Sequence, residues 1–296
     1  MDKKDLKHII DVAAGREPAD LCLKNCRIID VFNKEVFESD LLISDGTIAG
    51  YGKNSAQDAK NTIDLKGAFV APGFIDGHVH IESSHLSPAY FSQMIVPHGT
   101  TTVIADPHEI CNVCGLDGFD YMLKSTEDIA LRVFLQFPSC VPATPFENSG
   151  AILKAKEISE RIDHPRVLGL GEMMNFPGVV NADDEILDKI MVAYNAKKII
   201  DGHCPYLVGS QLDAYAVPGI RDEHECTTPE DLKERTRRGI YVMLRQGTSC
   251  HDVENLLQGV NEKNERFCLF CTDDRQAASL LNEGHIDNNI RQAVRK

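Results

Sequence analysis

Two histidines that follow a short apolar run form the pattern with the clearest chemical meaning in this sequence. The segment from Pro72 to Ser84 places His78 and His80 two residues apart, after a run of apolar and small residues. In an extended strand, residues i and i+2 point to the same face. Both imidazole rings can therefore reach one point, as two ligands of one metal ion must. A pair of buried histidines with a purely structural role is the alternative interpretation.

Single histidines or carboxylates follow four further runs that are typical of buried strands. These residues are Glu172 after residues 167–171, His203 after 198–202, His224 after 219–223 and Asp273 after 267–272. Taken singly, such a residue is more often a loop or helix-capping residue. In a (β/α)8 barrel, however, the active site lies at the carboxyl ends of the strands. We therefore expect six ligands from five strands to converge at the mouth of such a barrel.

The order of the elements from Gly73 onward predicts an α/β fold, a (β/α)8 TIM-like barrel. Strand-like and helix-like patterns alternate, which is the signature of parallel βαβ units. The predicted strands are 74–80, 100–105, 131–137, 167–171, 198–202, 219–223, 240–244 and 267–272. The predicted helices are 87–97, 115–126, 150–162, 183–194, 209–216, 229–238 and 251–263. The absence of a glycine-rich phosphate loop after the first strand counts against a nucleotide-cofactor fold.

The N-terminal residues have a different pattern and predict a separate, smaller domain. We expect residues 1–70 to form a helix and part of a small β-domain, and residues 71–296 to form the barrel and end in the helix after its eighth strand. Within the small domain the predicted helix covers 5–14, and the predicted strands cover 21–31, 36–43, 47–50 and 62–70. Asp45-Gly46 is typical of a tight hairpin turn between two of these strands.

Charge and cysteine content limit the classes of partner and the compartment. The chain has 296 residues and a formal net charge of −14, which argues against a nucleic acid or an anionic membrane as partner. The charged segment from Met1 to His8 is unlike a signal peptide, and no apolar run reaches the length of a membrane span. Ten cysteines without a secretory leader fit the reducing cytoplasm. We therefore expect a cytoplasmic protein that acts on a small molecule.

Two Cys-x-x-Cys pairs invite a zinc-ribbon interpretation, which the predicted elements disfavour. The pairs are Cys111 with Cys114 and Cys268 with Cys271. The second pair lies in a predicted strand, where residues three apart point to opposite faces. Joint chelation is therefore not expected, and the histidines and carboxylates remain the candidate ligands.

Several longer segments extend the ligand series, and with them the chain resembles the adenine deaminases of the amidohydrolase superfamily. The resemblance runs from Asp11 to Arg291. Its most specific segments are 72–84, 100–109, 139–143, 169–178, 201–204 and 271–275. A general member of the superfamily would share the His-x-His pair and the final aspartate, but not Asp106-Pro107-His108-Glu109 or Glu172-Met173-Met174.

The resemblance implies an activity and a length. It implies hydrolysis of adenine to hypoxanthine and ammonia, as in purine salvage, with adenine as the small-molecule substrate. Members of this family continue well beyond the position that matches Lys296 and complete the small β-domain there. A truncated chain with an exposed sheet edge is therefore expected. A homo-oligomer is compatible with the fold, although no interface can be identified from the sequence.

The residues also define the chemistry that such an activity would need. Displacing the amino group of adenine by water requires a strong nucleophile, and a bound metal lowers the pKa of its water to about 7. Imidazole and carboxylate ligands suit zinc, manganese or ferrous iron; the resemblance favours a binuclear centre of Mn(II) or Fe(II), with Zn(II) as the alternative. A metal-bound hydroxide would attack the ring.

We assign each predicted ligand to a role. His78, His80 and Asp273 are expected to bind one metal, His203 and His224 the other, and Glu172 to bridge them. Asp273 is also the expected general base, with an N-cap role as its alternative and Asp274 as the substitute base. The predicted catalytic residues are Asp273, Glu172 and His224.

A second group of polar residues is expected around the same mouth. Asp106, His108 and Glu109 follow the second predicted strand. They are expected to orient the substrate, to hold a further cation, or to hydrogen-bond to the ligands. Glu82 lies two residues after His80 and would share its face if the strand continued; it is a candidate ligand, substrate contact or partner of an imidazole N–H.

Two other functions remain open from the sequence. The chain could bind metal without turnover, if the segment that longer members carry completes the substrate pocket. It could instead act on another purine or a cyclic amide, because one fold supports many chemistries. Metal content without turnover would indicate the first alternative, and a substrate panel would separate the second from adenine hydrolysis.

Overall fold

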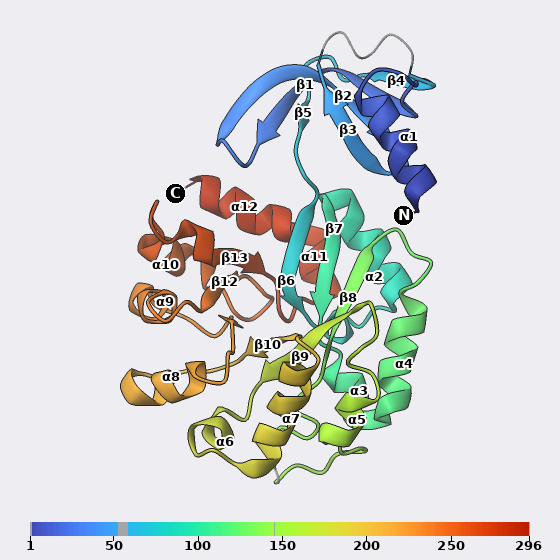
Figure 1. Cartoon of the computed structure of the whole chain (residues 1–296). Coiled ribbons are helices and arrows are strands. Elements are labelled where there is room, and N and C mark those ends of the chain that lie inside the picture. The colour runs from blue at the N-terminus through green and yellow to red at the C-terminus, as the bar shows by residue number, and fades with distance from the viewer. Residues whose placement is uncertain (1, 53–58, 145, 296) are drawn as a thin grey trace. The chain divides into compact units, whose positions relative to one another are not determined.

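The computed structural model describes residues 2–52, 59–144 and 146–295. The chain divides into two compact units, Met1–Pro72 and Gly73–Lys296. The first is a small sheet with one helix, and the second carries every residue of the candidate site (Figure 1).

The first unit begins with helix α1 (Lys3–Ala13), which Asp2 caps by accepting from the backbone N–H groups of Lys4 and Asp5. Its strands are β1 (Leu21–Asp30), β2 (Glu35–Ser44), β3 (Thr47–Tyr51), β4 (Asn61–Asp64) and β5 (Phe69–Val70). The strand order is β3-β2-β1-β4, with β5 also paired to β1. β2 is antiparallel to both β1 and β3, whereas β4 and β5 run parallel to β1.

Turn chemistry explains the boundaries in this unit. Asp45 and Gly46 both have positive φ, +49° and +68°, as a tight hairpin between β2 and β3 requires. The predicted strand 62–70 is wrong as a continuous element: it divides into β4 and β5. Lys66 and Gly67 have φ of +50° and +84°, and this left-handed turn interrupts the extended backbone.

In the described part of the second unit, eight strands follow one another along the chain, and neighbours in the sheets are parallel. They are β6 (Phe74–Val79), β7 (Thr100–Ala105), β8 (Arg132–Phe137), β9 (Val167–Met173), β10 (Ile199–Gly202), β11 (Asp222–Glu223), β12 (Tyr241–Arg245) and β13 (Cys268–Cys271). One sheet has the order β10-β9-β8-β7-β6 and the other β11-β12-β13.

Backbone hydrogen bonds join these two sheets into a barrel. The Asp273 N–H donates to the His78 carbonyl at 3.0 Å, and the His80 N–H donates to the Asp273 carbonyl at 3.2 Å, which links β13 to β6. On the other side, the Arg221 N–H donates to the Ile200 carbonyl at 3.2 Å. The predicted (β/α)8 barrel class is thereby confirmed.

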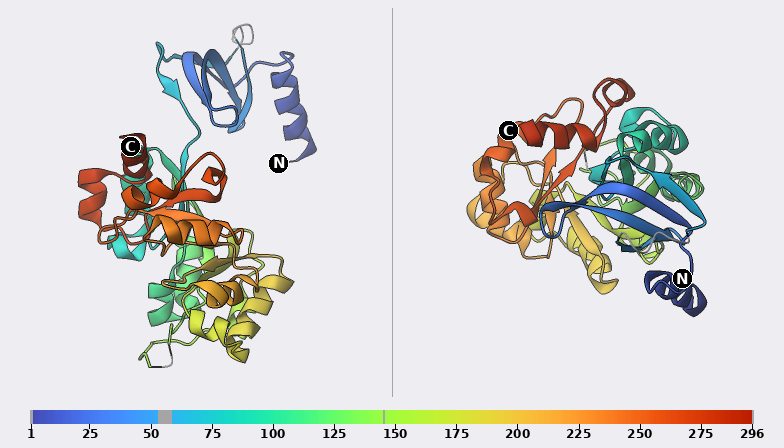
Figure 2. Two further views of the ribbon diagram at one scale, coloured as in Figure 1. Left: turned by 90° about the vertical axis from the view of Figure 1, so that its left-hand side faces the viewer. Right: turned by 90° about the horizontal axis from the view of Figure 1, so that it is seen from above.

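Helices lie outside the strands of this unit, as the turned views of Figure 2 also show. They are α2 (Pro88–Ile95), α3 (His108–Cys114), α4 (Leu116–Ser125), α5 (Ala155–Ser159), α6 (Phe176–Val180), α7 (Asp184–Asn195), α8 (Gly209–Ala216), α9 (Pro229–Thr236), α10 (Val253–Leu256), α11 (Ala277–Glu283) and α12 (Ile286–Arg295). Apolar side chains such as Phe91, Phe119 and Leu135 form the core of this unit. None of the helices in the described residues has both the length and the apolar character needed to cross a membrane.

Several predicted elements are longer than the observed ones. The predicted strand 219–223 contains only the two residues of β11, because Gly219 has φ of +89° and forms a turn. The predicted helix 150–162 is reduced to α5; the backbone N–H groups of Gly150 and Leu153 donate to Asn112 and Val141 instead of to a helical turn. The predicted helix 251–263 stops early as α10 and a single 3₁₀ turn, since Val260 is extended.

Two further differences concern elements that the sequence did not predict. The short helices α3 and α6 are too brief to show a helical repeat in the sequence. The expected single helix after the eighth strand is wrong: α11 and α12 both follow β13, separated by Gly284 with φ of +101°. A turn at a left-handed glycine ends one helix and lets the next begin in another direction.

Candidate metal centre

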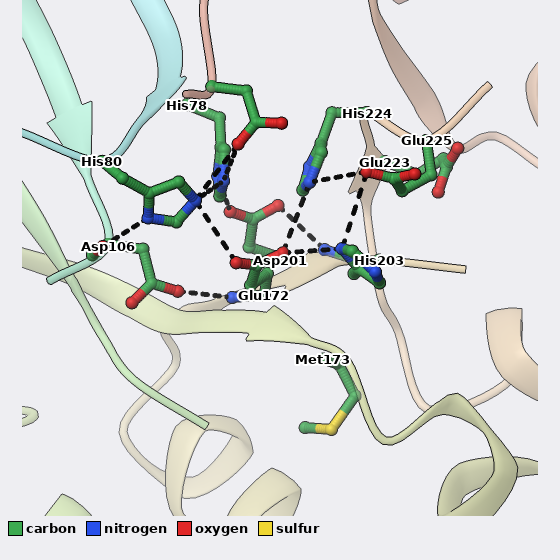
Figure 3. Close-up of polar contacts among 12 residues, drawn as sticks. His78, His80, Asp106, Glu172, Met173, Asp201, His203, Glu223, His224 and Glu225 are labelled. Carbon is green, nitrogen blue, oxygen red and sulfur yellow. Dashed lines mark hydrogen bonds and ion pairs between the residues drawn. The ribbon is translucent and has the colours of Figure 1, made fainter. Parts of the chain in front are cut away.

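The six predicted ligands come from five strands and lie at the same end of the barrel. His78 is in β6 and His80 directly follows Val79, while Glu172 is in β9. His203 and His224 directly follow β10 and β11, and Asp273 lies two residues beyond β13. Figure 3 shows the labelled histidines and Glu172 pointing toward one another.

His78 and His80 present the same ring nitrogen to one space. The His78 Nδ1 lies 2.8 Å from Asp201 Oδ2, and the His80 Nδ1 lies 2.8 Å from the backbone carbonyl of Asp106. A carboxylate and a carbonyl can only accept, so each Nδ1 carries a proton, and in the neutral form of each ring the Nε2 has a free lone pair. Those two Nε2 atoms lie 3.0 Å apart. Two acceptor nitrogens at this distance need a proton or a cation between them.

Glu172 divides the cluster into two sides. Its Oε1 lies 3.3 Å from His80 Nε2 and 3.1 Å from His108 Nδ1. Its Oε2 lies 2.7 Å from His203 Nδ1 and 3.3 Å from His224 Nε2. One carboxylate that faces two groups of nitrogen donors through its two oxygens has the arrangement of a bridging ligand.

These spacings fit metal ions better than a network of hydrogen bonds. Ligand bonds of about 2.1 Å in tetrahedral geometry put neighbouring ligand atoms about 3.4 Å apart. The distances between donors in this cluster are 2.7–3.9 Å. Among the described residues, His203 Nδ1 and His108 Nδ1 have no well-aligned hydrogen-bond partner although each lies beside Glu172. Buried polar atoms without a partner are rare unless an ion or water satisfies them.

The electrostatics of the cluster show how closely its charges interact. Burial and the neighbouring histidines lower the pKa of His78 to about 3. For His80, burial acts to lower the pKa, but hydrogen bonds to Asp273 and Glu172 outweigh it and raise the pKa well above its usual value. For Glu172, burial acts to raise the pKa, but the surrounding histidines hold it well below its usual range. A carboxylate held ionised in a buried position is ready to bind a cation.

Asp273 has its two oxygens on different partners. Its Oδ1 lies 3.2 Å from His80 Nε2 and 3.9 Å from His78 Nε2, and its Oδ2 accepts from Arg245 Nη1 at 3.0 Å. Its backbone has a φ of +56°, unusual for a residue other than glycine and costing about 1–2 kcal/mol. Asp273 is not a helix cap, because α11 begins at Ala277 with Gln276 as its N-cap.

The Asp106-Pro107-His108-Glu109 segment also reaches this cluster. The carboxylate of Asp106 is fully buried, and its Oδ2 accepts from the backbone N–H of Glu172 at 2.9 Å. His108 faces Glu172, and Glu109 Oε2 lies 3.6 Å from His80 Nδ1. Burial acts to raise the pKa of Asp106 to about 7. Asp106 therefore supports the strand that carries Glu172, while His108 and Glu109 line the mouth.

Glu82 and Asp274 lie beside these residues but not as expected. The strand does not continue past Val79, and Glu82 begins the 3₁₀ turn η2 (Glu82–Ser84), so the expected face-sharing with His80 is wrong. Its Oε1 accepts from the Ile110 N–H at 3.4 Å, and burial together with Glu109 raises its pKa to about 7. Asp274 is exposed and accepts a hydrogen bond from the Ser83 hydroxyl.

Two polar partners of the ligands were not found by sequence reasoning. Asp201 holds His78, and burial raises the pKa of Asp201 to about 6. Asp201 lies two residues before His203, so an extended strand would put both side chains on the same face. This spacing could have indicated that Asp201 also faces the site. Arg245 ends β12, which together with β8 is one of two barrel strands for which no site residue was expected, and it contacts both Asp273 and Glu225. No spacing rule relates an arginine to carboxylates that distant elements supply.

The chain is similar to known proteins over most of its length. A sequence profile of the Amidohydrolase family matches residues 69–291. The chain is 53% identical over 291 residues to "Adenine deaminase 2" of Desulfotalea psychrophila, covering 98% of this chain and 50% of the relative. It is 52% identical over 289 residues to "Adenine deaminase" of Nitratidesulfovibrio vulgaris strain DP4, covering 98% of this chain and 50% of that relative. The chain thus spans about half the length of these curated relatives.

Solved structures share the fold at low sequence identity. Atrazine chlorohydrolase TrzN from Arthrobacter aurescens TC1, solved in complex with zinc, superposes with a TM-score of 0.62 and 13% identity. The match covers 86% of this chain and 72% of that structure. At this identity the comparison supports the barrel fold alone.

Proposed function

The chain belongs to the amidohydrolase family, and from this premise we propose that it hydrolyses adenine to hypoxanthine and ammonia. Two relatives about half identical to it carry the name adenine deaminase, which supports the choice of substrate. The observation that carries the proposal is the position of Glu172, whose two oxygens face two separate groups of histidines. Such a divided donor set suits this reaction class, because two cations held on its two sides could act on one water.

We propose that the donor set holds two divalent metals. His78, His80, Asp273 and Glu172 Oε1 would hold one, and His203, His224 and Glu172 Oε2 the other. When bound, the metals would lower the pKa of a bound water to about 7 and so supply a nucleophile at neutral pH. Imidazole and carboxylate donors suit Mn(II), Fe(II) and Zn(II); we propose Mn(II) or Fe(II), as the resemblance to adenine deaminases implies.

The ligand histidines are positioned for this task by residues behind them. Asp201 accepts the Nδ1 proton of His78, and the Asp106 carbonyl accepts that of His80. Both rings are thereby fixed with Nε2 toward the centre, and a carboxylate behind an imidazole also makes it a stronger donor. His224 stacks on His78, with ring centroids 4.1 Å apart, so its ring is also held in place.

Asp273 is the proposed proton carrier. Its Oδ1 faces the space between His78 and His80, where the attacking water would lose a proton. In the reaction the water oxygen forms a bond to C6 of adenine and the bond from C6 to the amino nitrogen breaks. Asp273 would carry one proton of the water to ring N1 and the second to the departing amine, which leaves as ammonia while C6 keeps the oxygen as a carbonyl.

Residues at the rim are proposed to orient the purine. His108 and Glu109 lie near His80. The Ser83 hydroxyl is within hydrogen-bonding distance of Glu109 and Asp274, and Glu82 accepts from the backbone N–H of Ile110, next to Glu109. Their hydrogen-bonding groups can match the ring nitrogens and the amino group of adenine. Asp106 would act indirectly, by holding the backbone of Glu172.

The compartment and the assembly belong to the same proposal. All ten cysteines are free, which fits the reducing cytoplasm that we propose as its location. We also propose that the chain forms a homo-oligomer, which sedimentation of the purified chain would test.

A substrate panel tests the proposal. The chain loaded with Mn(II) or Fe(II) would be offered adenine, guanine, cytosine and hydantoin, and ammonia would be measured for each. Adenine alone is expected to release ammonia, with hypoxanthine as the second product. Turnover of another member of the panel but not of adenine would replace adenine by that substrate class. Two metals per chain without turnover of any compound would instead identify a metal-binding chain without activity.

A further inference from the structure

Arg245 occupies an unusual position beside the proposed metal centre. It is the last residue of β12 and is only 5% exposed. Its guanidinium contacts three carboxylates, those of Asp273, Glu225 and Asp252. A buried cation needs partners of opposite charge, so carboxylates around Arg245 are expected. Two of these three carboxylates also lie close to the predicted ligand histidines.

The first partner is Asp273, the proposed proton carrier. Arg245 Nη1 donates to Asp273 Oδ2 at 3.0 Å. The other oxygen, Oδ1, is the one that lies 3.2 Å from His80 Nε2. The arginine therefore occupies one oxygen and leaves the second directed at the donor cluster.

The second partner is Glu225, directly after the ligand His224. Its carboxylate accepts from Nη1 and also from Nη2 of Arg245, the latter at 3.3 Å. Its Oε1 lies 3.8 Å from His224 Nε2 and 3.9 Å from His203 Nδ1. The same guanidinium group thus reaches the side of the cluster formed by His203 and His224, while Asp273 belongs to the side of His78 and His80.

The third partner fixes the arginine itself. Arg245 Nε donates to Asp252 Oδ2 at 3.1 Å, and the Asp252 backbone N–H donates to the Arg245 carbonyl at 3.0 Å. In the part of the chain that the structure describes, Asp252 forms no hydrogen bond or ion pair with a predicted ligand histidine or with Glu172. Its carboxylate therefore orients the plane of the guanidinium without joining the cluster.

We propose that Arg245 is a positioning residue that aligns the carboxylates of Asp273 and Glu225 on the two sides of the metal pair. This inference rests on the proposed metal centre. Glu172 spans the two sides as a shared ligand, and Arg245 spans them from the neighbouring strand as a shared donor. Without it, Asp273 and Glu225 would repel each other and rotate away from these positions. A planar, forked donor can hold two carboxylates at once, whereas a lysine ammonium is a single point charge.

Cobalt(II) as a probe metal tests this role without requiring turnover. Cobalt affinity and the visible absorption spectrum of the cobalt-loaded chain would be measured for wild type, Arg245→Lys, Arg245→Gln and Asp252→Asn. Arg238→Lys is the matched control, because Arg238 also pairs with two carboxylates, Asp213 and Glu234, but lies just after the outer helix α9. Turnover of adenine would be measured in parallel with the metal that supports it best.

Both Arg245 variants are expected to weaken cobalt binding or lower kcat about 10- to 100-fold, the usual effect of removing a group behind a metal ligand. Their cobalt absorption bands should shift, while those of Arg238→Lys should not. Asp252→Asn should shift the bands in the same direction by a smaller amount.

Other results would overturn the inference. If Arg245→Lys matches wild type while Arg245→Gln does not, charge alone suffices and alignment plays no part. If neither Arg245 variant folds, Asp252→Asn decides, and an unchanged cobalt spectrum in that variant contradicts the inference. A wild-type chain that does not turn over adenine would refute the proposed substrate, whereas the cobalt comparison would still decide the role of Arg245.

Discussion

The Nε2 atoms of His78 and His80 lie 3.0 Å apart, while their Nδ1 atoms are hydrogen-bonded to different acceptors, the Asp201 carboxylate and the Asp106 carbonyl. This relationship places two lone pairs in the same small volume. A protonated ring relieves their repulsion in the metal-free chain, and a cation would do so in the loaded one. A positive charge, from a proton or a cation, is therefore stabilised at the point where the two Nε2 atoms meet.

Alanine at His78 or at His80 should remove metal. Each substitution deletes one donor and leaves the other without its partner, so we expect the chain to bind at most one metal and to lose at least about 100-fold in turnover. Elemental analysis of the purified variants measures the metal content, and ammonia release measures the turnover. His98→Ala is the control, because that histidine pairs with Asp287 and is not among the predicted ligands. Unchanged metal content in both variants would refute the assignment.

Asparagine at Asp201 should weaken the metal centre without emptying it. The carboxylate behind His78 fixes the ring and strengthens its donor nitrogen, and loss of such a group typically costs about 10- to 100-fold in metal affinity or activity. Competition with a chelator measures the affinity. Asp213→Asn, on the outer helix α8, serves as the control. Equal affinities for the two variants would mean that Asp201 contributes only packing.

Alanine at Gly171 should destabilise the fold and also shift the position of Glu172. A Cβ at this position would lie 2.1 Å from Asp106 Oδ2, so the carboxylate that accepts from the Glu172 N–H must move. Overpacking of this kind costs about 1–3 kcal/mol. Urea unfolding compares this variant with Gly50→Ala, where a Cβ meets nothing within 4 Å. Similar midpoints for both variants would contradict the prediction.

Stability of the metal-free chain should fall as pH rises above neutrality. For His224, burial acts to lower the pKa, but the hydrogen bond to Glu172 and the charge of Asp273 outweigh it and raise the pKa to about 10. A group with a raised folded-state pKa contributes stability that is fully present below its unfolded value of about 6.5 and is lost as pH rises toward about 10. Urea unfolding at pH 6.5 and 9.5 should show a larger loss for wild type than for His224→Gln. Equal losses would be evidence against a protonated His224.

The ligand series could be predicted because strand geometry is simple. Residues two apart in an extended strand point to the same face, so His78 and His80 could be placed together. The carboxyl ends of parallel barrel strands lie at one end of the barrel, so Glu172 and Asp273 could be placed near them. The structure brings all six candidates together, while their role as metal ligands stays a prediction. Glu82 fails the same rule, since the chain leaves the strand at Val79 and turns into η2.

The supporting residues could not be predicted because their partners are distant in sequence. Arg245 depends on carboxylates supplied after β11 and β13, and Asp201 on a histidine 123 positions away. Such contacts follow from closure of the barrel and not from any local pattern. Short helices such as α3 are missed for a related reason, since fewer than two turns leave no periodic signal.

The central claim is that a pair of metals held by Glu172 drives adenine hydrolysis, and one titration tests it most directly. Ammonia release from adenine would be followed while Mn(II) or Fe(II) is added to the metal-free chain under reducing conditions. We predict activity that rises with metal to two equivalents per chain, disappears with a chelator, and is absent in Glu172→Gln. Turnover that needs no metal, or that survives in Glu172→Gln, would contradict the claim.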